Sequence, residues 1–354
     1  MTLITKMRVQ HLAALAFSLL LPWGAMAQQP AAPAQKPAEA AMPAPPPAAG
    51  STAAQDWNNP PAWSDVERTP QYASIPGRET NVLIQDSGKQ WRMLRNGPVT
   101  FYGGIVILVV PALLLLFYLA KGSIKTREKP TGRVIERFNG AERVAHWTMA
   151  ISFVALALTG LTILFGKHVL LPWLGYSVFA TITEIGKNVH NFVGPLFIFS
   201  LVVLVVMFVK DNLWRPYDRE WLKNFGGMLS GKHIAAGRFN AGEKIWFWGG
   251  VIVLGVVIAI SGTVELFPNW NTSRELMGQF NLIHAIAACI FIAVSFVHIY
   301  LGTVGMEGAY KAMREGYVDE SWAKEHHDLW YDDVKAGKRP EKIIGAPQPA
   351  AGDD

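Results

Sequence analysis

The feature that most constrains this chain is the run from Asn281 to Gly302, which is long and apolar enough to cross a bilayer. It contains no Asp, Glu, Lys or Arg, yet it carries His284 and His298, 14 residues apart. In an α-helix that spacing corresponds to a rise of about 21 Å and places the two side chains within about 40° of one face. An ionisable side chain inside a membrane helix is a functional hypothesis by default. Two such side chains, one near each leaflet, predict two buried groups stacked across the membrane, and we expect these to be two haems.

The bulk composition agrees with a membrane protein. The chain has 354 residues, of which 51% are hydrophobic and 17% charged; the mean hydropathy of +0.20 is too high for an ordinary soluble domain. Its basic residues flank apolar runs instead of alternating with aromatics, so nucleic acid is not an expected partner. The single cysteine, Cys289, excludes an internal disulfide and a four-cysteine metal site, and no C-x-x-C-H motif is present. Metal chemistry in this chain must therefore use histidine.

The N-terminal quarter predicts export. Residues 1–27 combine a basic start, an apolar stretch and a small-x-small cleavage site, which is the pattern of a signal peptide. Residues 28–54 are an Ala/Pro-rich linker that cannot bury a core. Residues 55–98 hold several tryptophans but are too few for a substantial core, so we expect a periplasmic segment that lies against a partner or the membrane lipid.

Five apolar runs follow, and their flanking charges give a topology. The loop after the first run and the loop 210–244 are rich in Lys and Arg, which is typical of the cytoplasmic side. We therefore expect a multi-pass protein of the bacterial inner membrane with a periplasmic N-terminus and a cytoplasmic tail, 305–354. Residues 166–189 are expected to be a short loop outside the membrane. The expected spans are 99–120, 147–165, 190–209, 245–264 and 281–302.

The histidines pair by depth in this topology. His190 and His284 fall near the outer face, whereas His146 and His298 fall near the inner face. Two imidazoles from facing helices can supply both axial ligands of a haem iron. An isolated intramembrane histidine that only bonds a neighbouring helix is the simpler alternative, but it does not explain two pairs at two depths. His326 and His327, adjacent in the tail, leave a metal site there as a less favoured alternative.

Two axial histidines leave no open coordination position, so electron transfer is favoured over oxygen activation. A transporter or proton channel using the histidines as a relay would instead predict helices interrupted by Gly or Pro at mid-membrane, and the span with His284 and His298 shows no such break. A passive membrane anchor would leave the paired histidines unexplained.

Several motifs resemble the gamma subunit of respiratory formate dehydrogenase, the cytochrome b556 membrane subunit. They are RVAHW, VHNFVGP, RFNAGEKIWFW, LIHAIAA, FVHIY and EGYVDESWAKEHHDLWY, in that order between about residues 133 and 332. The resemblance implies an all-α integral membrane fold: a four-helix di-haem cytochrome b core over 121–304, with one additional N-terminal transmembrane helix over 99–120. It also implies the same ligand pairs that were expected from the depths of the histidines in the membrane, namely His190 with His284 and His146 with His298.

The resemblance further implies partners and an acceptor. A molybdenum or tungsten catalytic (alpha) subunit would oxidise formate, an iron–sulfur (beta) subunit would pass electrons to the outer haem b, and quinone would be reduced beside the inner one. The family's quinone site matches Asn240, Gly242, Glu243 and His298 in this sequence. A second explanation of Asn240 and Glu243 is a helix capping box, and the two are compatible. The cytochrome b subunit of a nickel–iron hydrogenase or a thiosulfate reductase remains an alternative with the same helical plan.

Overall fold

The computed structural model describes residues 86–227, 233–270 and 273–345. Five helical stretches in this part are long and apolar enough to cross a membrane, which confirms the expected helical membrane fold. The predicted signal peptide (1–27), the linker (28–54) and most of the segment 55–98 lie outside the described residues. The five stretches are Gly88–Lys121, Gly140–Val169, Leu171–Phe208, Ala241–Leu266 and Arg274–Gly305.

The first membrane helix begins earlier than its apolar run. Helix α3 (Asp86–Leu94), a π-helical turn, η1 (Arg95–Val99), and α4 (Thr100–Lys121) follow one another without a break. The polar start of this helix is held by the bundle, because Trp91 Nε1 donates a hydrogen bond of 2.9 Å to Asn281 Oδ1. Further along, a Cβ at Gly103 would meet Cys289 Sγ at 2.7 Å, so α4 approaches the bundle closely where glycine faces cysteine.

Helices α5 (Gly140–Val169) and α6 (Leu171–Phe208) form a long antiparallel pair. Helix α6 contains the one residue with non-helical dihedrals in this pair, Gly175 with φ of 73°. The prediction of a loop over 166–189 is wrong, because most of these residues are helical and His190 lies inside α6 instead of opening it. Polar residues such as Glu184 and Lys187 lower the hydropathy there without breaking the helix.

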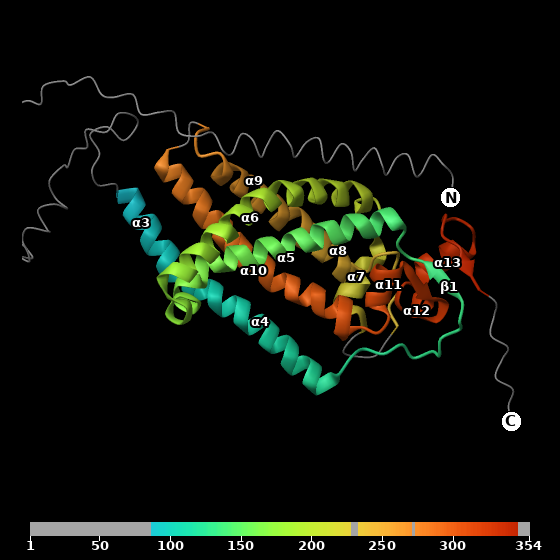
Figure 1. The fold of residues 1–354 in the computed structure, drawn as a ribbon. Helices are drawn as coiled ribbons and strands as arrows, with labels where there is room; N and C mark the ends of the chain where they lie inside the picture. Colours follow the sequence, from blue (N-terminus) through green and yellow to red (C-terminus); the bar gives the residue numbers. More distant parts are fainter. Residues whose placement is uncertain (1–85, 228–232, 271–272, 346–354) are drawn as a thin grey trace, which may run out of the picture.

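The remaining spans are also continuous. Helix α8 (Ala241–Ile245), the π-helical segment η3 (Trp246–Leu254) and α9 (Gly255–Leu266) make the fourth. Helix α10 (Arg274–Tyr300) and η4 (Leu301–Gly305) make the fifth. Helix α10 is central: it contacts α4, α5 and α9 (Figure 1). Between the fourth span and α6, the short elements α7 (Pro216–Lys223) and η2 (Phe225–Gly227) lie at the bundle end, where Lys244 Nζ pairs with Asp218 Oδ2 at 2.7 Å.

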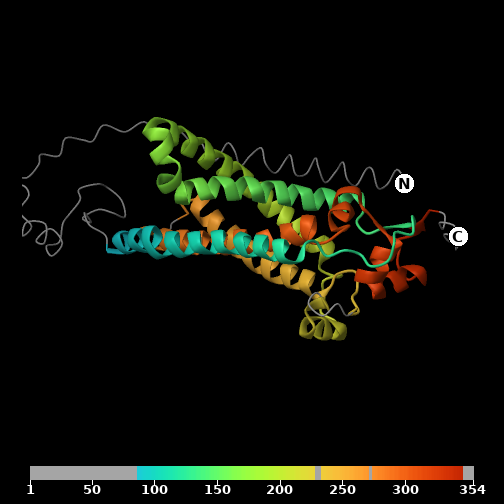
Figure 2. The same ribbon diagram turned by 90° about the horizontal axis from the view of Figure 1, so that it is seen from below.

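Residues 306–345, which follow the fifth span, are folded. Strand β1 (Val134–Glu136) pairs antiparallel with β2 (Tyr317–Asp319) and with β3 (Ile343–Ile344), so that Ile135 lies opposite both Val318 and Ile343. We call β1 with the following Arg137 and Phe138, the loop 233–239 and residues 309–345 the cap, because the loop is hydrogen-bonded to Asp328 and His327. The cap occupies one end of the bundle (Figures 1 and 2). Its buried centre includes Ile135, Trp322 and Trp330. The cap also contains α11 (Ala309–Glu315), α12 (Glu320–His326) and α13 (Asp328–Lys335).

Candidate haem sites

The first histidine pair lies in the half of the bundle away from the cap, and we call it the cap-distal pair. His190 from α6 and His284 from α10 face each other with ring centroids 6.2 Å apart and planes at 71°. A side-chain hydroxyl on the preceding membrane helix lies within hydrogen-bonding distance of each ring. Thr159 Oγ1 on α5 lies 2.8 Å from His190 Nδ1, and Ser261 Oγ on α9 lies 3.0 Å from His284 Nδ1. Nδ1 of each ring is therefore occupied, which leaves Nε2 as the free nitrogen.

A glycine follows each of these hydroxyl residues and makes room for the imidazole. A Cβ at Gly160 would meet His190 Cε1 at 3.4 Å, and a Cβ at Gly262 would meet His284 Cε1 at 3.1 Å. The dipeptides Thr159–Gly160 and Ser261–Gly262 are thus part of the site, and neither was among the site residues predicted from the sequence. Their signal is the same hydroxyl–glycine pattern on two spans, at the end where a histidine of the next span is expected.

The second pair lies beside the cap, and we call it the cap-proximal pair. His146, in the second turn of α5, and His298, in the last turn of α10, have ring centroids 6.2 Å apart and planes at 55°. Their surroundings are aromatic. The His298 ring stacks on Trp246 at 4.7 Å and 11°, and His146 meets the edge of Trp147 at 5.3 Å. His146 Nδ1 is buried and has no hydrogen-bond partner among the described residues.

An aromatic layer separates the two pairs. Phe291 lies midway between His284 and His298 on α10, is 1% exposed, and contacts Phe153 with ring centroids 4.8 Å apart and Phe197 at 6.5 Å. The layer is part of the bundle's hydrophobic core. The 14-residue spacing on α10 corresponds to about 21 Å between the two levels.

The donor set at both levels fits a six-coordinate haem. An imidazole nitrogen lies about 2.0 Å from a bound metal and about 1 Å from its own ring centre, so two imidazoles on opposite sides of one iron have centroids about 6 Å apart. Both pairs match this separation. Neutral imidazoles in an apolar bundle are suitable ligands for haem iron.

A family model described as prokaryotic cytochrome b561 matches residues 137–316, which include both histidines of each of the two pairs. The chain belongs to this cytochrome b family. Membership implies haem b and a role in electron transport. The cytochrome is also 33% identical over 223 residues to the nitrate-inducible cytochrome b556(Fdn) subunit of formate dehydrogenase from Escherichia coli, covering 60% of this chain and 98% of that one.

Two further relatives carry related names. The cytochrome b556(fdo) subunit of Escherichia coli formate dehydrogenase is 32% identical over 204 residues, which cover 57% of this chain and 93% of that protein. The formate dehydrogenase cytochrome b556 subunit of Haemophilus influenzae is 27% identical over 216 residues, covering 59% and 87%. These matches confirm the resemblance to the formate dehydrogenase gamma subunits.

Three of the four residues expected to bind quinone, Asn240, Gly242 and Glu243, lie at the start of the fourth span, and the other, His298, belongs to the cap-proximal pair. Asn240 Oδ1 accepts a 3.0 Å hydrogen bond from Glu243 N, and Glu243 Oε2 accepts one of 2.8 Å from Asn240 N. The capping box is therefore present. Glycine at 242 has a packing reason, because a Cβ there would meet Trp221 at 2.8 Å. One turn further along, Trp246 connects this turn to His298 by stacking.

Glu243 has a second partner in the cap. Its Oε1 accepts a 3.1 Å hydrogen bond from Arg137 Nη2, while the carboxylate side chain stays 38% exposed. Arg137 is buried among four aromatic rings, those of Phe138, Phe239, Trp322 and Trp330. Burial lowers the pKa of Arg137 to about 10, although Glu243 opposes this shift, so the guanidinium remains charged at neutral pH.

The cap contains further buried charges. Arg238 pairs with Asp211 at 2.7 Å and Glu142 at 2.9 Å, which joins α5 to the loops. Burial alone would raise the pKa of Asp211, but hydrogen bonds from Arg339 and Arg238 outweigh burial and lower it.

His327 donates from Nδ1 to the Gly237 carbonyl, and burial holds its pKa well below 6.5. No group of three or more His, Cys, Asp or Glu side chains that could hold a metal ion occurs among the described residues, which include His326 and His327.

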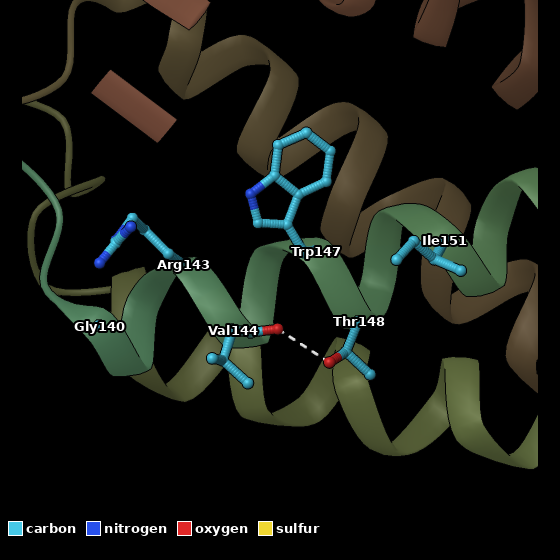
Figure 3. A pocket seen from close by; sticks show the side chains of 6 residues that line it. All are labelled: Gly140, Arg143, Val144, Trp147, Thr148 and Ile151. Carbon is cyan, nitrogen blue, oxygen red and sulfur yellow. Dashed lines mark hydrogen bonds between the residues drawn. The ribbon is translucent and has the colours of Figure 1, made fainter. Parts of the chain in front are cut away.

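A groove of about 420 Å³, lined by residues of α5 between Gly140 and Ile151, runs along one face of that helix (Figure 3). Arg143 Nη1 donates to the Arg314 carbonyl at 2.9 Å, and Trp147 Nε1 donates to the Met313 carbonyl at 3.3 Å. Val144 and Ile151 are well exposed, as expected of side chains that face lipid. None of the four paired histidines lines the groove, which therefore lies outside the candidate haem sites.

Proposed function

We propose that this cytochrome is the di-haem membrane subunit of a membrane-bound formate dehydrogenase, carrying electrons from a periplasmic iron–sulfur subunit across the membrane to quinone. The proposal rests on the cap-distal and the cap-proximal histidine pairs. In each pair the ring centroids are 6.2 Å apart, and each pair includes one histidine of α10, at a different level of that helix. His190 and His284 would ligate one haem iron, and His146 and His298 the other. Each bis-histidine haem would supply one-electron transfer.

The direction of transfer follows from the proposed topology. Basic residues in 121–133, 210–227 and 233–244 lie at the cap end of the bundle, and by the positive-inside rule they support a cytoplasmic cap. The cap-distal pair would then face the periplasm. Electrons would enter near His284 and leave near His298. The aromatic layer of Phe153, Phe197 and Phe291 fills the space between the two levels with apolar side chains and excludes water there.

The overall reaction balances across three chains. Formate would lose two electrons and one proton on a molybdenum or tungsten catalytic subunit to give CO₂. The two electrons would pass singly through the iron–sulfur subunit and this cytochrome. Quinone would accept both electrons together with two protons to form quinol. Proton uptake at the cytoplasmic end would couple the reaction to a proton-motive force.

Quinone would bind where the fourth span meets the cap, near Asn240, Gly242, Glu243 and His298. Support comes from the exposed edge of Glu243 and from Trp246, which covers the His298 ring. Both oxygens of Glu243 already accept hydrogen bonds, from Asn240 N and from Arg137. We therefore propose that Glu243 shapes the site and that proton delivery does not require its titration.

The test is to purify the intact complex from its native membrane through a tag on this chain. We expect a molybdenum or tungsten subunit and an iron–sulfur subunit to co-purify, formate to reduce a b-type spectrum, and added quinone to reoxidise it. His298→Ala should keep a formate-reducible signal but lose quinone reduction, whereas His284→Ala should lose both. His233→Ala, which changes a half-exposed histidine paired with Asp328, is the control and should behave as wild type. Co-purification of a nickel–iron subunit would overturn the formate assignment in favour of a hydrogenase.

A further inference from the structure

The hydroxyls beside the cap-distal histidines determine which ring nitrogen carries the proton. Thr159 Oγ1 lies 2.8 Å from the Ala155 carbonyl of its own helix, and Ser261 Oγ lies 2.6 Å from the Val257 carbonyl. A hydroxyl has one hydrogen to donate, and a carbonyl can only accept. A hydroxyl that donates to its helix carbonyl accepts from the imidazole, and in this arrangement His190 and His284 carry the proton on Nδ1.

This arrangement has two consequences for a metal on Nε2. It fixes the tautomer that leaves the Nε2 lone pair free, and it orients the ring. A hydrogen bond from Nδ1–H also increases the basicity of a ligating imidazole, which stabilises the oxidised metal. Both ligands of the cap-distal pair have such an acceptor.

The cap-proximal pair lacks this support. His146 Nδ1 is buried without a partner within the described part of the chain. The His298 ring stacks on Trp246, and among the described residues no hydrogen-bond partner of its ring nitrogens is found. The ligands of the two levels therefore differ in basicity although their ring separations are the same.

We propose that Thr159 and Ser261 are positioning residues that hold His190 and His284 as Nδ1–H tautomers and keep the reduction potential of the cap-distal haem below that of the cap-proximal haem. The inference rests on the proposed di-haem function. It gives the electron path a thermodynamic direction, because electrons move spontaneously from the lower to the higher potential. With the cap in the cytoplasm, that direction is inward, toward the proposed quinone site.

The test is a redox titration of the purified complex, with each haem assigned by the signal lost in His284→Ala or His298→Ala. Thr159→Val and Ser261→Ala remove the hydroxyl acceptor with little change of volume, while the backbone carbonyls of Leu156 and Ile258, which the two rings also approach, remain. Each should raise the midpoint potential of the cap-distal haem, with a shift of about 59 mV corresponding to a tenfold change in the ratio of reduced to oxidised haem. The cap-proximal potential should not move.

Matched controls are available on the same helices. Thr162→Val and Thr263→Val remove hydroxyls that also bond their own helix carbonyls, at 2.9 and 2.7 Å, but do not bond the histidines. These variants should leave both potentials unchanged. Two bound haems with no selective shift, or a wild-type cap-distal potential above the cap-proximal one, would overturn this inference while leaving the di-haem function standing. Absence of haem from the wild type would instead overturn the proposed function.

Discussion

The cap-distal and cap-proximal histidine pairs have the same ring separation, 6.2 Å, but different surroundings. The cap-distal rings are held through Nδ1 by hydroxyls, and glycines give them space. The cap-proximal rings are held by aromatic contacts and lie next to a folded cap rich in buried charge. The bundle thus contains two sites with the same donor set, two imidazoles each. The sites differ in the contacts that orient the imidazole rings. The cap-distal site should depend on residues inside the membrane, and the cap-proximal site on the cap.

The largest expected effect comes from filling the space beside a cap-distal ring. A Cβ at residue 262 already approaches His284 Cε1 to 3.1 Å, so the methyls of Gly262→Val should displace the imidazole and remove most of the cap-distal haem. The cap-proximal haem should remain. Gly249→Val, in the same span but with no neighbouring atoms within 4 Å, is the control for a bulky residue. Haem content and difference spectra measure the result, and equal loss of both haems would contradict the comparison.

The next effect should be confined to the cap. Arg238 is 9% exposed and pairs with Glu142 and Asp211. Asp211 keeps Arg339 as a partner, but Arg238→Ala leaves the buried carboxylate of Glu142 without a counter-ion and should cost about 3–5 kcal/mol. Limited proteolysis of the cap during heating measures the loss. The cap-proximal haem signal should disappear at a lower temperature than the cap-distal one. Lys324→Ala, which breaks an exposed pair with Glu128, should change almost nothing.

A smaller effect is expected at Glu243. Gln can complete a capping box as Glu does, but its single oxygen then no longer accepts from Arg137, so Glu243→Gln should lower quinone reduction by no more than about twofold. Glu243→Ala removes both contacts and should lower the rate further. The rates of quinone reduction by the reduced complex measure the difference. A loss of about tenfold or more in Glu243→Gln would show that the carboxylate transfers protons.

A further effect is a pH dependence of the cap. The pKa of buried His327 lies well below 6.5 in the folded protein, so below pH 6.5 the unfolded chain binds a proton that the folded chain does not. The contribution of neutral His327 is complete above pH 6.5, and cap stability should fall by up to about 1.4 kcal/mol per pH unit below it. Hydrogen exchange of α12 and α13 at pH 7.5 and 5.5 measures this. His327→Gln should remove most of the dependence, and an unchanged dependence would assign it to other groups.

Much of the membrane fold was predictable from the sequence, because a helix that crosses lipid needs a long apolar run and cationic flanks. The depths of the four histidines followed from those runs, and the structure brings together the same partners that depth predicted. The extension of α6 over residues 176–189 was missed because Glu184 and Lys187 lower the hydropathy without ending the helix.

Two features could not be predicted, for different physical reasons. The cap depends on pairing between Ile135 and Val318, which are distant in sequence and give no local periodicity. Thr159 and Ser261 were not recognised because hydroxyl and small residues are common in membrane helices. Only the spatial arrangement shows that each of them faces a histidine.

The central claim is that the two histidine pairs each hold one haem b. The most direct measurement is haem per chain in the purified protein, together with its reduced-minus-oxidised spectrum, for the wild type, His284→Ala and His298→Ala. We predict two haems in the wild type and one in each variant, with a different spectral component lost in the two cases. A wild type without a b-type signal, or variants that each keep both haems, would contradict the account.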